Sequence, residues 1–300
     1  MDNLNFVVCP SYHGATLLSL LLNNHSRVTS LGDTIPGRKY LGAGCACGTA
    51  VRDCPFWSAV LGALDSERFT AGEKVLPLWP RIVDDRQRWN RIAAVGLGTL
   101  AHVIGPSAWA LFRKEREEYT DTYSRFYAVV KDLHGTNLFV DGSKSMSKAF
   151  VLASMFPQAG VRIVHLVRDP RDYHCSNQKN NLDSATLVSS SRQWLDRHLA
   201  IISMARLIRR KTYLRVRYED LCGQPEATLS AVFQLFGIDY EDVLHRPKDR
   251  RKNHVIGNDS MARFDGTIRA SSNWRSTLSD AEARQVVRRT WPLCGYFGYV

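Results

Sequence analysis

The sequence lacks several features that define special classes of protein. Residues 1–4 carry no basic segment of the kind that begins a secretory signal, so we expect a cytoplasmic protein. The seven cysteines are an odd number and do not make a disulfide framework for a chain of 300 residues. No zinc-finger, helix-turn-helix or aromatic RNA-binding signature is present, and we expect no nucleic-acid partner. The sequence also has no internal repeat and no flexible linker between domains.

The sequence also lacks an uninterrupted apolar segment that could span a membrane. The longest apolar stretch, Ile92 to Phe112, approaches the length of a span, but Gly96, Gly98, Gly105 and Pro106 interrupt it. We therefore expect a buried helical hairpin here and no transmembrane segment.

Acidic side chains are outnumbered by basic ones. The 40 Lys and Arg against 29 Asp and Glu give a formal net charge of +11, which favours anionic ligands, acidic polymers or a membrane surface as partners. The apolar fraction of 44% argues against disorder. We expect a single α/β domain over residues 1–300.

Strand patterns alternate with helical patterns, which predicts a P-loop-like parallel sheet flanked by helices. The predicted strands are 5–9, 27–31, 137–140, 161–167 and 213–217, and the predicted helices are 15–23, 146–156, 186–209 and 225–236. Residues 80–133 have a helical period with a break at Gly105-Pro106, and we expect a helical insertion at about 55–134, between the second and third strands. By its position this insertion is a candidate wall of the acceptor pocket.

The strand at 161–167 ends in Arg168-Asp169-Pro170-Arg171-Asp172, where the proline suits the first turn of a helix. Ligands of α/β sheets bind at the carboxyl ends of the strands. The two arginines of this segment, Arg168 and Arg171, can hold a dianion there together with the hydroxyl of Ser176. The alternative interpretation is a surface cluster of salt bridges.

The first predicted strand leads through residues 10–16 into a helix. A strand, a turn with one glycine and a helix N-terminus place free N–H groups around an anion. The glycine and lysine spacing of a Walker motif is absent. An ordinary turn between strand and helix is the alternative.

Together these two segments resemble the nucleotide-binding motifs of the sulfotransferase superfamily, which uses 3′-phosphoadenosine 5′-phosphosulfate (PAPS). Residues 12–18 resemble the loop that binds the 5′-phosphosulfate, and Arg168 with Ser176 resembles the motif that binds the 3′-phosphate. Further stretches are similar in the same order to bacterial members that resemble carbohydrate sulfotransferases: 140–145, 216–221, 254–263, 274–275 and 295–299.

The resemblance implies a nucleotide site assembled from several parts of the chain. Its phosphosulfate loop would comprise Tyr12, His13, Gly14, Ala15, Thr16 and Leu17. Its remaining contacts would be Arg168, Ser176, Tyr218, Gly257, Asn258 and Arg263, with Tyr218 near adenine and residues 245–275 covering the nucleotide. An aromatic side chain that closes the end of a strand is the other interpretation of Tyr218.

The sequence departs from the family pattern at two positions, since Tyr12 replaces a basic residue and Ala15 removes a hydroxyl. The missing charge must then come from His13 or Lys144. Lys144 would neutralise the bridging oxygen as its bond breaks, unless it is a solvated strand end. The resemblance places the general base at Asp33, where relatives often have a glutamate, and His13 is the alternative.

We therefore expect a PAPS-dependent sulfotransferase that sulfates a hydroxyl, or an amine, of a carbohydrate or small-molecule natural product. Its second product would be adenosine 3′,5′-bisphosphate, and the chemistry needs no metal. The departures at Tyr12 and Ala15 leave open a non-catalytic member that binds the nucleotide or an anionic polymer. A nucleotide-binding kinase would also have a strand–loop–helix site, but its phosphate-binding lysine is absent.

Three cysteines lie close together, with Cys45 and Cys47 before Gly48 and Cys54 before Pro55. Three thiols can bind zinc, but no fourth ligand is evident at an ordinary spacing. We expect a structural or redox-labile segment, with a zinc site as the alternative.

Overall fold

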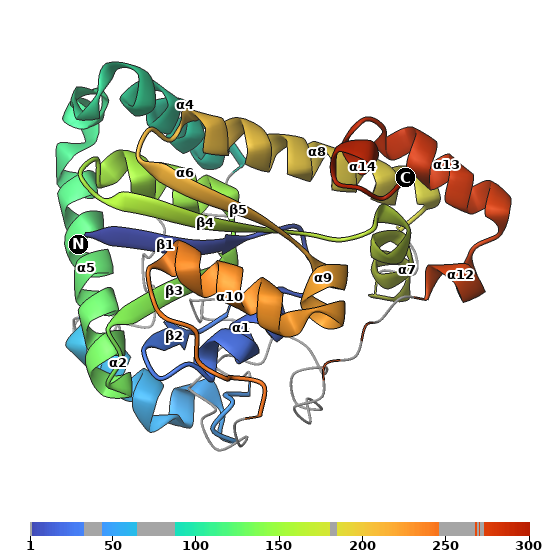
Figure 1. The fold of residues 1–300 in the computed structure, drawn as a ribbon. Helices are drawn as coiled ribbons and strands as arrows, with labels where there is room; N and C mark the ends of the chain where they lie inside the picture. Colours follow the sequence, from blue (N-terminus) through green and yellow to red (C-terminus); the bar gives the residue numbers. More distant parts are fainter. Residues whose placement is uncertain are drawn as a thin grey trace.

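Five parallel strands form the central sheet of the computed structural model, in the order β2-β3-β1-β4-β5 (Figure 1). The structure describes residues 2–32, 44–64, 88–180, 185–245, 268, 270 and 273–300. The strands are β1 Asn3–Val8, β2 Val28–Ser30, β3 Leu138–Lys144, β4 Gly160–Val167 and β5 Lys211–Arg217. The predicted parallel α/β sheet is confirmed.

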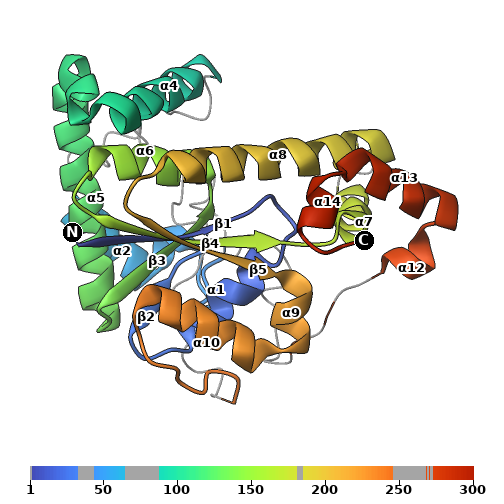
Figure 2. The same cartoon turned by 45° about the horizontal axis from the view of Figure 1, so that its top comes forward.

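Helices cover both faces of this sheet (Figure 2). One face carries α1 Ala15–Asn23, α9 Tyr218–Gly223 and α10 Pro225–Phe236. The other carries α6 Met146–Met155 and α8 Leu187–Leu207. Alternate residues of β1 supply the two cores, since Phe6 packs with the α6 and α8 side and Val7 with the α1 and α10 side.

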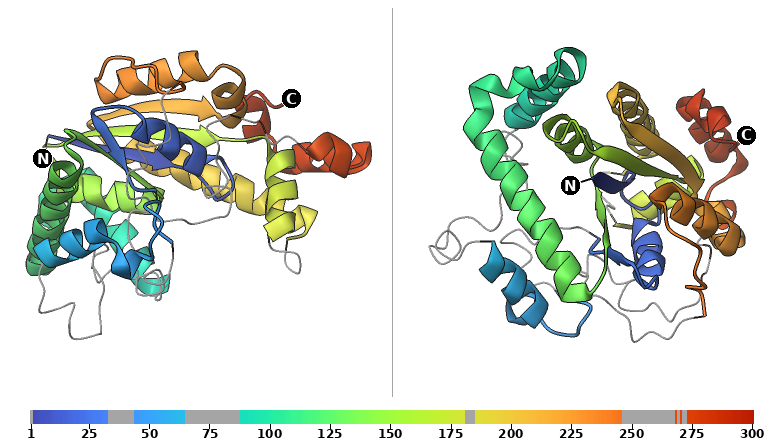
Figure 3. Two further views of the ribbon diagram at one scale, coloured as in Figure 1. Left: turned by 90° about the horizontal axis from the view of Figure 1, so that it is seen from below. Right: turned by 60° about the vertical axis from the view of Figure 1, so that its left-hand side comes forward.

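The insertion between β2 and β3 is helical, as predicted. It contains η2 Val51–Asp53, α2 Pro55–Ala63, α4 Arg88–Ile104, η4 Pro106–Phe112 and α5 Arg113–His134. The predicted break is present at Gly105, whose φ of 99° ends α4 before Pro106 begins η4. In Figure 3, α5 runs past the sheet with α2 beside it. No helix in the described part of the chain combines the length and the hydropathy needed to cross a membrane.

The C-terminal helices lie at the end of the sheet where β4 and β5 finish (Figure 1). They are α12 Trp274–Thr277, α13 Asp280–Thr290 and α14 Leu293–Tyr296. The helix α13 packs on α8 and on α7 Pro170–Asn180. This packing brings the last residues of the chain next to the segment that follows β4.

The strand β3 continues past its predicted end at residue 140 to Lys144. It does so because Asp141 is stabilised although its side chain is buried. Lys148 Nζ lies 2.5 Å from Asp141 Oδ2, and the Ser143 N–H donates to Asp141 Oδ1 at 2.9 Å. The pKa of Asp141 is lowered, because the charge of Lys148 and these hydrogen bonds outweigh the desolvation that would raise it. A buried carboxylate at this position is compatible with the sheet only in the presence of its lysine.

Candidate functional site

The site begins at the carboxyl ends of three neighbouring strands. Because the sheet is parallel, β1, β3 and β4 all finish at the same edge. The last residue of β1, Val8, is aligned with Lys144 of β3 and with His165 of β4. The loop of residues 9–14 therefore starts between the end of β3 and the end of β4.

Arg168 joins the two segments that the sequence singled out. Its Nη1 donates a hydrogen bond to the Tyr12 carbonyl at 2.7 Å and lies 3.3 Å from Ser176 Oγ. Its guanidinium lies over the ring of Tyr218, 4.6 Å from the ring centroid. The arginine is only 5% exposed. The loop after β1 and the end of β4 thus meet through direct contacts.

Gly14 allows the loop to pack in this way. Its φ is +87°, and a Cβ atom at this position would lie 2.4 Å from Cδ2 of Tyr218. The position therefore requires glycine both for its backbone conformation and for the close approach of the ring. Gly14 is also the N-cap of α1, and neither a side-chain cap nor an acidic residue occupies this end of the helix. The first N–H groups of α1, beside the half-buried Thr16, are suited to bind an anion.

Two residues at this edge that are not glycine have left-handed backbones. Tyr12 has a φ of 64° and Lys144 a φ of 65°. They are linked through the start of the loop, since the Cys9 N–H donates to the Lys144 carbonyl at 3.3 Å. Such conformations cost free energy and persist where surrounding contacts enforce them, which is common at functional sites.

A chain of buried histidines lies behind the loop. His13 Nδ1 is 2.8 Å from the Ser11 carbonyl, and His13 Nε2 is 3.0 Å from Nε2 of His198 on α8. His198 Nδ1 is 2.8 Å from Nε2 of His165 on β4, and His165 Nδ1 contacts the Tyr213 hydroxyl on β5. The three histidines are at most 1% exposed.

These contacts fix where each proton lies. The Ser11 carbonyl can only accept, so His13 carries its proton on Nδ1 and its Nε2 accepts from His198 Nε2–H. His198 Nδ1 then accepts from His165 Nε2–H, and His165 Nδ1 accepts from the Tyr213 hydroxyl. All three rings are neutral in this arrangement.

The pKa values agree with neutral rings. Burial lowers the pKa of His13 to about 3; the charges of Arg168 and Arg197 act in the same direction, and its backbone hydrogen bonds oppose them. Burial and the neighbouring His13 lower the pKa of His165 to about 3 as well. Burial lowers the pKa of His198 well below its usual value. Both nitrogens of His13 are engaged within the protein, which leaves neither ring nitrogen for a proton from an acceptor.

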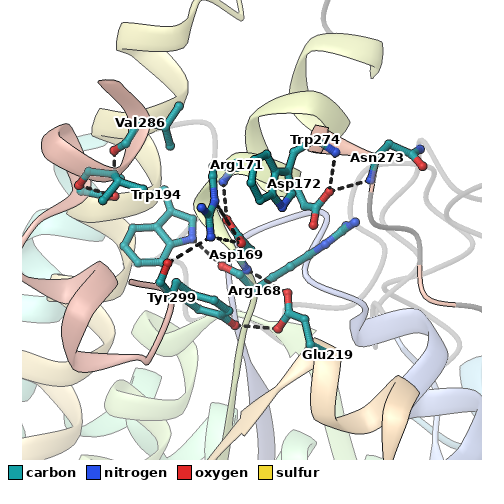
Figure 4. Close-up of polar contacts among 12 residues, drawn as sticks. Arg168, Asp169, Arg171, Asp172, Trp194, Glu219, Asn273, Trp274, Val286 and Tyr299 are labelled. Carbon is teal, nitrogen blue, oxygen red and sulfur yellow. Dashed lines mark hydrogen bonds and ion pairs between the residues drawn. The ribbon is translucent and has the colours of Figure 1, made fainter. Parts of the chain in front are cut away.

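In contrast to the neutral histidines behind the loop, charged residues surround the start of α7 (Figure 4). The Arg171 guanidinium donates to both carboxylate oxygens of Asp169, at 2.6–3.1 Å, and to the Tyr299 carbonyl at 3.0 Å. It also lies over the Trp274 ring, 4.1 Å from the centroid. Glu219 accepts from the Asp169 N–H at 3.0 Å and from the Tyr299 hydroxyl at 2.7 Å. The C-terminal segment is thereby attached to the end of β4.

The four charged residues after β4 consequently divide into two groups. Asp169 and Arg171 form the salt bridge that the alternative interpretation predicted, and Asp172 accepts from the N–H groups of Asn273 and Trp274 at 2.8 and 3.1 Å. Arg168 points away from these three, toward the loop after β1 (Figure 4). Arg171 thus joins the C-terminal segment to the end of β4, whereas Arg168 contacts the loop after β1.

Some of the predicted site residues cannot be placed. Asp33, Gly257, Asn258 and Arg263 lie outside the described residues. The other predicted residues, 12–17, Lys144, Arg168, Ser176 and Tyr218, gather around the carboxyl edge of β1, β3, β4 and β5.

Sequence reasoning did not find the partners that hold these residues. His165 gave a weak signal, because it interrupts an apolar strand. Residues 295–299 resembled the family, but this likeness gave no contact for Tyr299, and nothing in the sequence around His198 indicated a contact with the site.

Comparison with known proteins places this geometry in context. A family model described as the sulfotransferase family matches residues 58–242, which run from within α2 to just beyond α10. Comparison of the sequence with curated proteins gave no match.

Two solved structures are similar along their whole length. The sulfotransferase domain from the Synechococcus PCC 7002 olefin synthase has a TM-score of 0.53 and 16% identity, over 96% of this chain and 95% of that one. The sulfotransferase domain from the curacin biosynthetic pathway has a TM-score of 0.50 and 14% identity, over 96% and 97%. At these identities the likeness shows a shared fold.

Proposed function

The chain belongs to the sulfotransferase family, and we propose that it transfers a sulfuryl group from PAPS to a hydroxyl of a carbohydrate or small-molecule natural product. The acceptor oxygen forms a bond to sulfur while the bond from sulfur to the bridging oxygen of the phosphosulfate breaks. The products are the sulfate ester and adenosine 3′,5′-bisphosphate, and the acceptor proton passes to a base. The observation that carries the proposal is the contact of Arg168 with the Tyr12 carbonyl, which joins the two predicted anion sites at one edge of the sheet.

The binding roles follow from the position of each group. The first N–H groups of α1 and the Thr16 hydroxyl would bind the 5′-phosphosulfate at the helix N-terminus. Arg168 and Ser176, already 3.3 Å apart, would bind the 3′-phosphate through a guanidinium and a hydroxyl. Tyr218 would lie beside the adenine, and Gly257, Asn258 and Arg263 would cover the nucleotide.

The catalytic roles separate charge neutralisation from proton transfer. Lys144 stands at the end of β3 next to the phosphosulfate loop, where its ammonium would neutralise the bridging oxygen as the bond breaks. Asp33 would accept the acceptor proton. His13 is a positioning residue in this scheme, because its ring nitrogens bind Ser11 and His198 and hold the loop from behind.

The nucleotide site is tested with Arg168→Ala. Loss of the charge-assisted contact should weaken the binding of adenosine 3′,5′-bisphosphate by about 2–3 kcal/mol, or about 30- to 150-fold, in isothermal calorimetry. Arg192→Ala is the matched control, since Arg192 is an 83% exposed arginine on α8. Thermal unfolding of both variants checks that the fold is retained. An unchanged affinity in Arg168→Ala would contradict the assignment of the 3′-phosphate site.

The transfer step is tested separately with Asp33→Asn. Transfer of radiolabelled sulfate from PAPS is measured on a panel of carbohydrate and small-molecule hydroxyl acceptors. Asp33→Asn should bind the nucleotide as the wild type does and lose most of the turnover, because the amide cannot accept the proton. Full turnover in Asp33→Asn would remove Asp33 as the base. Tight nucleotide binding without transfer to any acceptor would favour a non-catalytic member of the family.

A further inference from the structure

Three cysteine sulfurs meet in the segment between β2 and α2. Cys47 Sγ lies 3.5 Å from Cys54 Sγ, and Cys54 Sγ lies 3.6 Å from Cys45 Sγ. All three sulfurs lie within 4.8 Å of one another. Cys45 and Cys54 are buried, whereas Cys47 is exposed. None of these three cysteines is among the residues predicted for the nucleotide site.

The spacing of the sulfurs matches one face of a metal–thiolate tetrahedron. A zinc ion that is bonded to thiolates at about 2.3 Å separates their sulfurs by about 3.8 Å. The two measured separations, 3.5 and 3.6 Å, lie close to this value. Small movements of the side chains would therefore place three sulfurs around one ion.

The backbone holds the first two cysteines in a tight turn. Gly44 and Ala50 form an antiparallel bridge, and the Cys45 N–H donates to the Thr49 carbonyl at 2.8 Å. The Gly48 N–H donates back to the Cys45 carbonyl at 2.9 Å, and Gly48 has a φ of +97° that favours glycine. The turn directs both sulfurs toward Cys54.

Cys54 lies at the start of a helix. It immediately precedes Pro55, the first residue of α2, and the Ser58 N–H donates to its carbonyl at 2.9 Å. Two chain segments of different structure therefore converge on one point.

A cation would also balance the charge of three thiolates. Cys45 and Cys54 are buried, and thiolates held this close together are stable only beside a positive charge.

We infer that Cys45, Cys47 and Cys54 bind one Zn²⁺ ion as thiolates. Three protons leave as the three zinc–sulfur bonds form, and no oxidation takes place. Thiolate ligands select a soft ion, and zinc is the common occupant of tetrahedral thiolate sites. The fourth position opens on the side of the exposed Cys47, where water or a further side chain completes the tetrahedron. The ion cross-links the 44–50 turn to the start of α2.

The test measures metal on the full chain, purified under reducing conditions without chelator. Elemental analysis should find one zinc per chain, and Co²⁺ should give the sulfur-to-cobalt charge-transfer and visible d–d bands of a tetrahedral thiolate site. Cys47→Ser, an exposed position, should lose these bands and most of the zinc. Cys222→Ser changes a half-buried cysteine outside the cluster and should keep both. Removal of zinc should lower the melting temperature of the wild type and leave that of Cys47→Ser unchanged.

Three outcomes would overturn the proposal. The first is a reduced wild-type chain that takes up neither Zn²⁺ nor Co²⁺. The second is a Cys47–Cys54 disulfide in the fresh protein, found by mass spectrometry, with no metal uptake after its reduction. The third is equal zinc content in Cys47→Ser and the wild type, which would place the ion elsewhere. The zinc readouts do not involve PAPS, so their failure is separable from failure of the proposed transferase activity.

Discussion

The loop after β1 and the segment after β4 lie side by side at one edge of the sheet, but different chemistry holds each in place. Neutral histidines support the first, through the hydrogen bonds from His13 to His198 and on to His165. Charges support the second, through Arg171 and Asp169. Both networks are largely buried, so each must satisfy its polar groups internally.

The difference between neutral and charged groups explains the structural role of each network. In the histidine chain every nitrogen has one role, donor or acceptor, so the chain fixes the orientation of the His13 ring and the backbone on either side of it. In the charged network Arg171 contacts a carboxylate, a backbone carbonyl and an aromatic ring at once, so it joins the C-terminal segment to β4. The first network requires neutrality, and the second requires that both charges be present.

The largest expected effect comes from breaking the charged network. Arg171→Leu leaves Asp169, only 6% exposed, without its cation, and it also removes the contacts to Tyr299 and Trp274. We expect the free energy of unfolding in urea to fall by about 3–5 kcal/mol. Arg192→Leu, at an 83% exposed position, should change it by less than about 0.5 kcal/mol. Equal small losses in the two variants would show that the network contributes little.

A smaller effect is expected from breaking the histidine chain. His198→Phe keeps an aromatic ring in the core but leaves His13 Nε2 and His165 Nε2–H without their partner. Buried polar groups without hydrogen-bond partners should lower the free energy of unfolding by about 2–3 kcal/mol. His245→Gln, on an exposed histidine paired with Asp242, is the control and should have little effect. Wild-type stability in His198→Phe would mean that the chain is not formed in solution.

The smallest expected effect concerns how the free energy of unfolding depends on pH. The histidines have a pKa near 6.5 when unfolded, against about 3 for His13 and His165 in the fold. Between these values the unfolded chain binds protons that the native chain does not, so stability falls as the pH is lowered. Each such histidine should contribute about 1.4 kcal/mol per pH unit.

Arg168 and Arg197 near His13, and Arg215 near His165, oppose protonation further. Urea unfolding between about pH 5 and 7 measures the slope for the wild type and for His198→Phe. The variant, with one histidine fewer in the chain, should show a slope that is shallower by about 1 kcal/mol per pH unit over this range, because the unfolded histidine is only partly protonated near pH 7. Parallel slopes would contradict the neutral chain. The Arg171 guanidinium stays charged throughout this range, because hydrogen bonds to Asp169 raise its pKa despite its burial.

The sequence predicted elements whose signals are local. The boundaries of α1 and α10 agree with the prediction, because Gly14 and Pro225 act on their own segment of chain. The break at Gly105-Pro106 is confirmed for the same reason. The end of β3 was predicted four residues too early, at 140 instead of 144, because the buried Asp141 is tolerated only through Lys148 on the next helix.

By itself, then, the sequence determined the alternation of strands and helices and the parallel sheet, and it predicted the two anion motifs. Hydrophobic periodicity and turn chemistry act over a few residues and can be read along the chain. Only the tertiary structure decided that Arg168 turns toward Tyr12 while Arg171 turns toward Tyr299, and that His198 supports His13 from another helix. Such choices depend on which donor and acceptor meet after folding, between residues as much as 185 positions apart, and no local pattern encodes them.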